Sequence, residues 1–406
     1  GIFGINRKRR PIIDISQIQS GRVRLGLFFS DQTHTSFSWN EDEVSLDFCM
    51  GQISKASSQK RQKVSHSRFA VQIDDGHFIE VFDPRQNMMS EQMRQSILNF
   101  NLDIIHGISK AISFRDLEFE DSVINRDFWT KNKHFSEKST MYTIRHTLQL
   151  PHSEIPQIKS ENNSRYFSDL ASIPLNAVLV RKLLQTKEVE IDIQEADYLV
   201  LEPRVISQIV RTLLPCFSLE HIKNKTSFLH DKIGQSIANR YVHISDDPLM
   251  MCGVNSRVFD VSGRSSQPRV LLQDGKVNDF YSNSLEQSTG HLNWDEQIFF
   301  GNIMVKSGRR SLNMIFDEGI KALIGECIVG KIDFDQKTGE ISFCLCLMLR
   351  EGNDQNSYAG LVRLKGNVLD ILSSVVEATN QSERFGFIDS SGWVLNKDIF
   401  SSLKMM

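Results

Sequence analysis

Histidines are the residues in this sequence whose chemistry would be easiest to recognise. The chain contains 11 of them but no HExxH motif, and no predicted helix carries two at positions i and i+4, the spacing that lets both imidazoles bind one zinc ion. His221 and His230 cannot share a helix face, and His243 lies in a predicted strand, where a lone histidine is usually structural. We therefore predict no metal or other cofactor in this chain.

Asp246 and Asp247 form a carboxylate pair that could perform acid–base chemistry or hold a hard cation. Adjacent residues of a strand point to opposite faces, however, so these two are poorly placed to act together. Pro248 follows directly, and Asp side chains accept hydrogen bonds from nearby amides in turns. A turn-forming role is the favoured interpretation.

Small and polar residues mark two further steps in the same half of the chain. Asp260 is most simply a turn or strand-end residue, and Ser288, Thr289 and Gly290 form a turn-like step. A loop of small residues could also let a peptide backbone approach closely. No GxSxG, Walker A or GxGxxG motif is present, and the scattered Ser, His and Asp residues give no basis for a catalytic triad.

Composition excludes several classes of function. With 406 residues, 40% hydrophobic and 24% charged, the sequence is typical of a globular protein and long enough for two domains. The net charge of -3 gives no general attraction to nucleic acid, and no apolar run is long enough to cross a bilayer. A basic cluster at 7–10 predicts a solvated leader rather than a lipid anchor.

The six cysteines do not form a disulfide scaffold. Cys344 and Cys346 would share one face of a strand, which could bring two thiolates near a metal, but no further ligands accompany them. Buried core thiols are the favoured interpretation. Their scatter suits a reducing compartment, so we expect a cytoplasmic protein.

The first half of the chain predicts strands followed by an amphipathic helix. Strands are expected at 24–29, 35–39 and 44–50, and a hairpin at 69–73 and 77–82 around its Asp-Gly step, with a polar loop at 54–67. The apolar stripe from Met93 to Ala111 predicts a helix with Ser90 as its N-cap. From 114 to 163 the sequence is polar and shows no clear periodicity.

The second half is predominantly β. A short helix is expected after Pro174, then a strand at 198–201 and a helix opened by Pro203. The later elements are a hairpin of 269–272 and 276–281, strands at 298–305, 341–349 and 362–364, and a helix at 367–376. We predict an α+β fold: an N-terminal domain (1–190) with an antiparallel or mixed sheet and amphipathic helices, and a β-rich C-terminal domain (191–406).

Several short motifs in the second half resemble those of the TldD/PmbA peptidase family, in the family's order. They are the strand and helix of 198–214, the SFL and K-x-G steps at 227–234, DDP at 246–248, FD-x-x-G at 259–263, LLQDG at 271–275, STG at 288–290, DEGI at 317–320 and GN-x-L at 366–369. The resemblance implies a C-terminal domain of the TldD/PmbA type. It is weaker in the N-terminal part.

The resemblance also implies a role. TldD-type chains of the family carry an HExxxH metal motif, whereas TldE/PmbA-type chains lack it and pair with them; this chain resembles the second type. The resemblance implies a metal-free subunit that forms a heterodimer with a TldD-like subunit, and the TldD-like subunit would hold a divalent metal. The implied activity of the pair is proteolysis of unstructured peptides, including leader removal from ribosomally made, modified peptides. Substrates would bind as an added β-strand. The implied peptide-binding or interface residues are Asp246, Asp247, Phe259, Asp260, Ser288, Thr289, Gly290, His291 and Asn367.

Two other functions fit the residues. One is an independent hydrolase whose scattered site matches no motif, and the other is a peptide-binding escort or scaffold without catalysis. The sequence also departs from the family at 114–163 and at His291, which follows the STG step. We interpret these departures as those of a copy dedicated to one peptide pathway.

Overall fold

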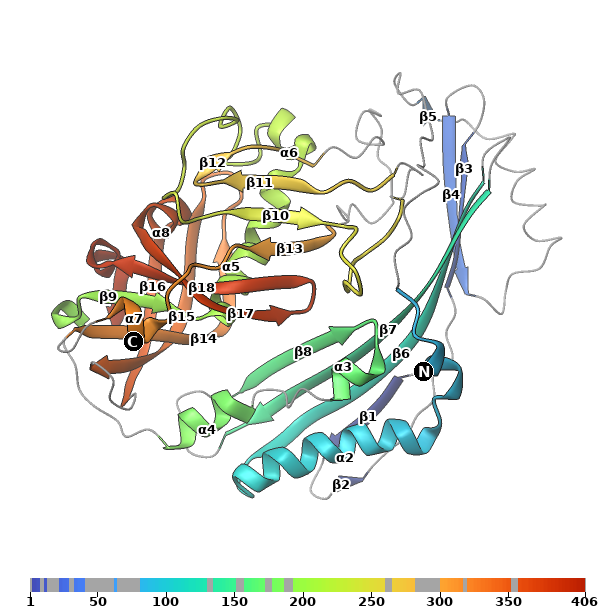
Figure 1. Ribbon diagram of the computed structural model, residues 1–406, viewed down its shortest axis with the longest axis horizontal. Coiled ribbons are helices and arrows are strands. Elements are labelled where there is room, and N and C mark those ends of the chain that lie inside the picture. The colour runs from blue at the N-terminus through green and yellow to red at the C-terminus, as the bar shows by residue number, and fades with distance from the viewer. Residues whose placement is uncertain are drawn as a thin grey trace.

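The computed structural model describes the chain in segments. These are 81–129, 134–150, 157–171, 177–185, 193–259, 265–281, 300–316, 320–351 and 357–405, together with five strand segments before residue 81. Figure 1 shows two large sheets with helices against them. Among the helices of these segments, none has the length and apolar character that crossing a bilayer requires.

The first sheet is antiparallel throughout, with the order β2-β1-β6-β7-β8. Its strands are β1 (Ile2–Arg7), β2 (Pro11–Ile12), β6 (Ser113–Trp129), β7 (His134–Gln149) and β8 (Ile158–Ser164). The helices of this layer are α2 (Glu91–Ile108), α3 (Phe167–Ala171) and α4 (Ala177–Gln185), preceded by a 3-10 turn at Pro84–Met88. This is the antiparallel sheet with amphipathic helices that was predicted.

Helix α2 forms as its apolar stripe predicts. Ser90 is its N-cap, and its Oγ accepts a hydrogen bond from the Met93 amide at 3.2 Å, which satisfies one of the unpaired amides of the first turn. Ile97, Leu98 and Ile105 are buried against the sheet, in one core with Phe114 and other apolar residues of β6 and β7.

The prediction of an irregular stretch at 114–163 is wrong, because β6, β7 and β8 occupy most of it. Two features hid these strands. A register shift between Phe114 and Asp116 interrupts the alternation, and polar side chains such as Asp121 and His146 take positions on the buried face. Of the basic cluster at 7–10, Arg7 is part of β1 and pairs with Pro11 of β2, while β1 pairs with β6 from Ile2 to Asn6. Residues 8–10 lie outside the described residues, so a solvated leader stays a prediction.

A small separate sheet has the order β3-β4-β5, with β3 (Arg22–Phe28), β4 (Thr33–Asn40) and β5 (Gln62–Lys63). The first two confirm the strands predicted at 24–29 and 35–39. The predicted strand at 44–50 and the Asp-Gly hairpin at 69–82 lie outside the described residues, apart from 81 and 82, and so does most of the predicted loop.

The second large sheet is mixed. Its order is β12-β11-β10-β13-β18-β9-β14-β15-β16-β19, with β17 paired to β18. The strands are β9 (Tyr198–Leu201), β10 (Ile244–Asp247), β11 (Arg269–Gln273), β12 (Lys276–Val277), β13 (Asn302–Val305), β14 (Lys321–Phe334), β15 (Glu340–Glu351), β16 (Ser357–Asn367), β17 (Val375–Phe385), β18 (Ile388–Asn396) and β19 (Leu403–Met405). The helices are α5 (Pro203–Leu213), α6 (Leu219–Lys223), α7 (Leu312–Ile315) and α8 (Val368–Ser374), and 3-10 turns lie at Ile193–Glu195, Leu214–Phe217 and Lys397–Ser402.

Local sequence signals account for much of this sheet. β9 has the predicted bounds and lies between β14 and β18, and Pro203 opens α5. The hairpin of β11 and β12 turns at Asp274 and Gly275, which both adopt positive φ, as a two-residue hairpin turn requires. The core on this side contains Trp393, which is fully buried.

The two layers share packing and hydrogen bonds. Cys327 of β14 and Cys346 of β15 belong to the same buried cluster as Leu148 and Leu179 of the first layer, which confirms that Cys346 is a core thiol. Cys344, predicted to be a core thiol as well, is only partly buried. The α+β architecture with antiparallel and mixed sheets is as predicted. A domain boundary near residue 190 stays a prediction.

Candidate functional site

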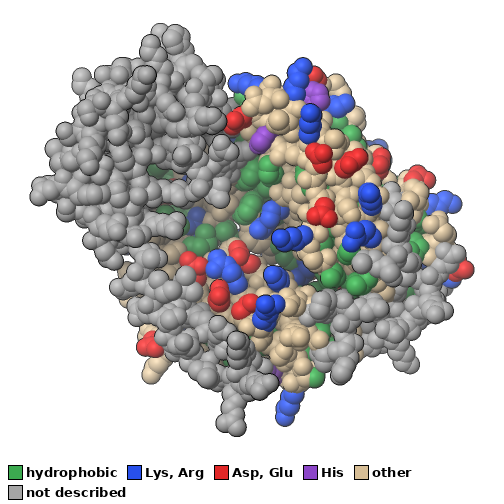
Figure 2. Space-filling model, turned by 180° about the vertical axis from the view of Figure 1, so that it is seen from behind, with side chains coloured by type: hydrophobic (Ala, Val, Ile, Leu, Met, Phe, Trp, Pro, Cys, Tyr) green, Lys and Arg blue, Asp and Glu red, His purple; other side chains and the backbone are tan. Residues whose placement is uncertain are grey.

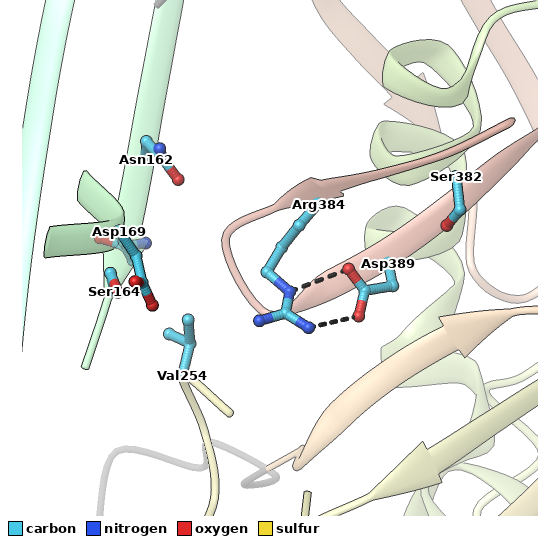
Figure 3. A pocket seen from close by; sticks show the side chains of 8 residues that line it. Asn162, Ser164, Asp169, Val254, Ser382, Arg384 and Asp389 are labelled. Carbon is cyan, nitrogen blue, oxygen red and sulfur yellow. Dashed lines mark hydrogen bonds and ion pairs between the residues drawn. The ribbon is translucent and has the colours of Figure 1, made fainter. Parts of the chain in front are cut away.

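A cleft of about 320 Å³ lies between the two layers (Figure 3). That volume is at the lower end of the range for ligand pockets in proteins. Its walls come from three places: the end of β8 with α3, the β17–β18 hairpin, and the loop after β10. The lining residues are Asn162, Asn163, Ser164, Asp169, Val254, Ser382, Arg384 and Asp389.

The first wall is the border of a sheet. β8 is the last strand in the order of the first sheet, with β7 as its partner on one side, and its other side is nearest the β17–β18 hairpin in Figure 1. An edge strand presents main-chain N–H and C=O groups to which an extended peptide can pair. This wall therefore offers main-chain recognition that does not depend on the sequence of a ligand.

The second wall carries a fixed guanidinium. Arg384 of β17 donates from Nε and Nη2 to the two carboxylate oxygens of Asp389 on β18, at 2.9 and 2.7 Å. This hydrogen-bonded pair, with Asp169 farther away, raises the pKa of Arg384, so its side chain stays charged at every physiological pH. The positive charge of the cleft is thus held in one orientation.

Helix α5 positions the hairpin that carries this wall. Arg211 donates to the Phe385 carbonyl at 3.3 Å and lies 5.1 Å from the centre of the Phe387 ring, while Arg204 lies 5.4 Å from the ring of Phe385. Burial lowers the pKa of both arginines, and the aromatic faces partly offset the loss of hydration. Gly386 turns the hairpin with φ of +63°.

The third wall is the loop at 248–258, and a buried arginine ties it to the first layer. Arg165 is 1% exposed, and it donates to the carbonyls of Gly253, Thr140 and Ser256 at 3.2, 2.9 and 3.4 Å. The amide of Val258 also donates to Glu137 of β7 at 2.8 Å. These bonds fix Val254 between the two layers.

Asp246 does not line the cleft, and the turn-forming role predicted for it is wrong, because it lies within β10 and accepts from residues far along the chain. Its Oδ2 accepts from the Tyr281 hydroxyl at 2.6 Å and from the Gly301 amide at 3.0 Å. Tyr281 and Phe300 also form an edge-on ring pair at 4.9 Å, so the carboxylate fastens the residues on both sides of segment 282–299. Burial raises the pKa of Asp246, and it raises that of Tyr281 strongly.

The other predicted site residues make contacts within the fold where they are described. Asp247 accepts from the Leu249 amide at 2.8 Å, as the turn-forming interpretation predicts, and Phe259 is buried. Asn367 caps α8, and it lies six strand positions from β10 in the sheet order, so the fold does not bring it together with Asp246. Asp260, Ser288, Thr289, Gly290 and His291 lie outside the described residues, and a ligand-binding role for the nine residues stays a prediction.

The charges on the described surface are mixed. On the face drawn in Figure 2, Lys and Arg side chains alternate with Asp and Glu rather than forming one basic surface. Within the described parts of the chain, no three His, Cys, Asp or Glu side chains are grouped so that they could hold one metal ion. The groups in this cleft suit the binding of a neutral polar ligand.

The sequence did not indicate the cleft residues. Asn162, Asn163 and Ser164 fell in the stretch interpreted as irregular, and Arg384 and Asp389 meet only because β17 and β18 pair across a turn. One signal was available: FGF at 385–387 places a glycine between two apolar residues and is typical of a tight hairpin.

These features define an α+β protein of two packed sheet layers with a small polar cleft between them. The chain belongs to the PmbA/TldA metallopeptidase family, whose C-terminal domain model matches residues 196–399, half of the sequence. The resemblance found in the sequence motifs is thereby confirmed.

Individual relatives are distant. The metalloprotease PmbA of Escherichia coli O157:H7 is 23% identical over 168 residues, which cover 38% of this chain and 37% of that protein. An uncharacterized protein of Methanocaldococcus jannaschii is 31% identical over 83 residues, 20% of each chain. The chain thus matches well under two thirds of the length of these relatives.

The fold is shared more widely than the sequence. The crystal structure of TldE from Thermococcus kodakarensis superimposes with a TM-score of 0.76 at 16% identity, covering 97% of this chain and 92% of that one. At this identity the likeness shows the fold alone.

Proposed function

We propose that this chain is a metal-free, TldE/PmbA-like subunit of a heterodimeric, cytoplasmic metallopeptidase that processes unstructured peptides. A TldD-like partner would hold the divalent metal and cleave the peptide. This chain would help to hold the substrate in an extended conformation, in the cleft beside β8. Leader removal from a ribosomally made, modified peptide is one reaction of this kind.

The single observation that carries the proposal is the edge strand β8 bordering the cleft of a metallopeptidase-family chain whose sequence contains neither HExxH nor HExxxH. Unfolded peptides share little apart from their main chain, and a sheet edge recognises that part of them. A chain that contributes substrate binding without its own metal motif fits a subunit better than a complete peptidase.

Co-expression with a TldD-like subunit tests the proposal. We expect the two chains to co-purify, stoichiometric metal to be found with the partner, and cleavage of an unstructured peptide to require both. As the control, replacing the partner's first HExxxH histidine by Ala should abolish cleavage and leave the complex intact.

Other outcomes would support the rival functions. Cleavage, or stoichiometric metal, with this chain alone would identify an independent hydrolase. Tight peptide binding by a chain that neither associates with the partner nor alters cleavage would identify an escort protein. Either result would overturn the proposed subunit role.

A further inference from the structure

One nitrogen of Arg384 is directed into the cleft. Nε and Nη2 both bond to Asp389, and Nη2 also lies 3.5 Å from the Met250 sulfur, whereas Nη1 takes part in no hydrogen bond among the described residues. Figure 3 shows the remaining nitrogen turned away from Asp389, toward Val254 and Asp169 on the opposite side. The Arg384 side chain is 43% exposed, so a ligand can reach this nitrogen.

The pair with Asp389 makes Nη1 a rigid donor. A guanidinium held by both oxygens of a carboxylate cannot rotate about its last bonds, so its remaining N–H groups keep one direction. A ligand therefore meets an ordered donor and loses little additional side-chain entropy when it binds.

The charges of the lining decide which acceptor this donor suits. Arg384 brings one positive charge, while Asp169 and Asp389 bring two negative charges, so the charged lining residues sum to -1. The other polar lining groups are the neutral side chains of Asn162, Asn163, Ser164 and Ser382. A carboxylate would be repelled here, whereas a neutral carbonyl oxygen accepts the hydrogen bond without that cost.

An extended peptide supplies such carbonyls on both of its edges, because the N–H and C=O groups of a strand lie along both sides. One edge would pair with β8. Because β17 already approaches β8, only a carbonyl of the part of the peptide that lies in the cleft would reach the Arg384 guanidinium. We propose that Arg384, held by Asp389, donates from Nη1 to a main-chain carbonyl of an extended peptide bound in the cleft beside β8. This inference rests on the proposed function, and it makes Arg384 a residue that binds any extended sequence.

Peptide binding to the full-length chain, alone and with its TldD-like partner, tests the inference. The probes are a fluorescein-labelled peptide of Ala, Ser and Thr with an amidated C-terminus and the same peptide with a free carboxylate. Fluorescence anisotropy should show that Arg384→Gln binds both about tenfold more weakly, the size expected for losing one hydrogen bond to a charged donor. Arg384→Lys should be weakened as well, because a lysine cannot bond to both Asp389 oxygens and still donate into the cleft.

Arg310→Gln is the matched control. It removes another arginine–carboxylate pair that involves β17, with Glu377, but neither residue lines the cleft, so its affinity should equal that of the wild type. Melting temperatures show whether each variant is folded.

A series of peptides with one amide at a time replaced by an ester locates the carbonyl. An ester carbonyl is a weaker acceptor, so one position should weaken binding to the wild type but not to Arg384→Gln, which measures the pairwise coupling directly.

The outcomes separate the inference from the proposed function. If the wild type binds neither probe, alone or with the partner, then the peptide-holding role fails, and the inference fails with it. If the wild type binds but the Arg384 variants bind equally well, or lose affinity only for the free carboxylate, the inference alone is overturned.

Discussion

At the residue scale, Asp246 is a buried anchor, and its replacement should be costly. It is 3% exposed and accepts from Tyr281 and Gly301. Asp246→Ala leaves both donors buried without this partner, so we expect a loss of about 2 to 5 kcal/mol in the free energy of unfolding. Asp246→Asn keeps an acceptor oxygen and should cost less. Urea unfolding at neutral pH measures both; equal losses would contradict the role of the acceptor.

The same residue gives a dependence on pH. Burial raises the pKa of Asp246 above its ordinary value of 3.8, so between these two values the folded chain binds more protons than the unfolded chain. The contribution of Asp246 to stability is therefore full below 3.8 and declines as pH rises through the folded pKa. The difference in unfolding free energy between wild type and Asp246→Asn should show this decline, and a flat difference would exclude it.

His146 should act in the opposite direction. It is 2% exposed, and burial, with the nearby charge of Arg204, lowers its pKa from 6.5 to about 3. The unfolded chain gains a proton as pH falls below 6.5 while the folded chain does not, so stability is lost across that window, by up to a few kcal/mol. His146→Leu should reduce this loss. Urea titrations at a series of pH values measure it, and unchanged slopes would refute the prediction.

Part of the surroundings of the candidate site could be predicted from residue types alone. The turn role of Asp247 was predictable because a short acidic side chain before proline has few alternatives. The burial of Asp246 and its bond to Tyr281 were not, because the two residues are 35 positions apart and meet only when β10 takes its place in the sheet.

At the element scale, the loop at 248–258 should depend on Arg165. Arg165→Met removes three hydrogen bonds to buried carbonyls, so we expect a loss of about 3 to 5 kcal/mol and faster hydrogen exchange in this loop. Arg145→Met on β7 is the control, because its pairs with Glu120 and Glu161 are half-exposed and should contribute under about 1 kcal/mol. Equal losses of stability in Arg165→Met and Arg145→Met would show that Arg165 does not hold the loop at 248–258 in place.

Asn367 tests whether a motif residue of the family is structural or functional. Its side chain accepts from the Leu369 amide and donates to the Thr338 carbonyl. Asn367→Ala should cost about 1 kcal/mol, whereas Ser, another good N-cap, should cost little. If Asn367→Ser weakens association with the partner while stability is kept, the residue belongs to an interface as well.

Helices and strands whose apolar residues repeat regularly were predictable from the sequence. Strands whose buried face also carries polar residues were not. The apolar stripe of α2 with its N-cap Ser90, and Pro203 at the first position of α5, made two helices predictable from the sequence. Strands β6 to β8 were not predicted because their buried face includes polar residues. Asp121 and Thr140 have hydrogen-bond partners elsewhere in the chain, and the ring of His146 packs edge-on against Phe114. The spacing of apolar residues indicates which positions are buried only where the buried residues are themselves apolar.

At the scale of the whole molecule, the cleft is a product of how the layers join. Its walls come from β8, β17 and β18, and the loop after β10, and no sequence signal links segments so far apart. The family motifs, by contrast, are local and ordered, so the C-terminal fold could be inferred from them. The packing of segments far apart in the sequence could be learned only from the structure.

The shared packing also predicts that the two layers unfold together. Cys327 and Cys346 of the large sheet pack in the same cluster as Ile105 of α2, and Arg165 bonds across the layers. Ile105→Ala should lower the global free energy of unfolding by about 2 to 5 kcal/mol, because it leaves a cavity in that cluster. If the layers are coupled, slow-exchanging amides of α2 and of β14 and β15 should lose the same amount of protection, as members of one cooperative unit do. Hydrogen exchange by mass spectrometry separates these elements. Loss of protection confined to α2 and β6 would show that the layers unfold independently, and that the cleft between them opens at a cost below that of global unfolding.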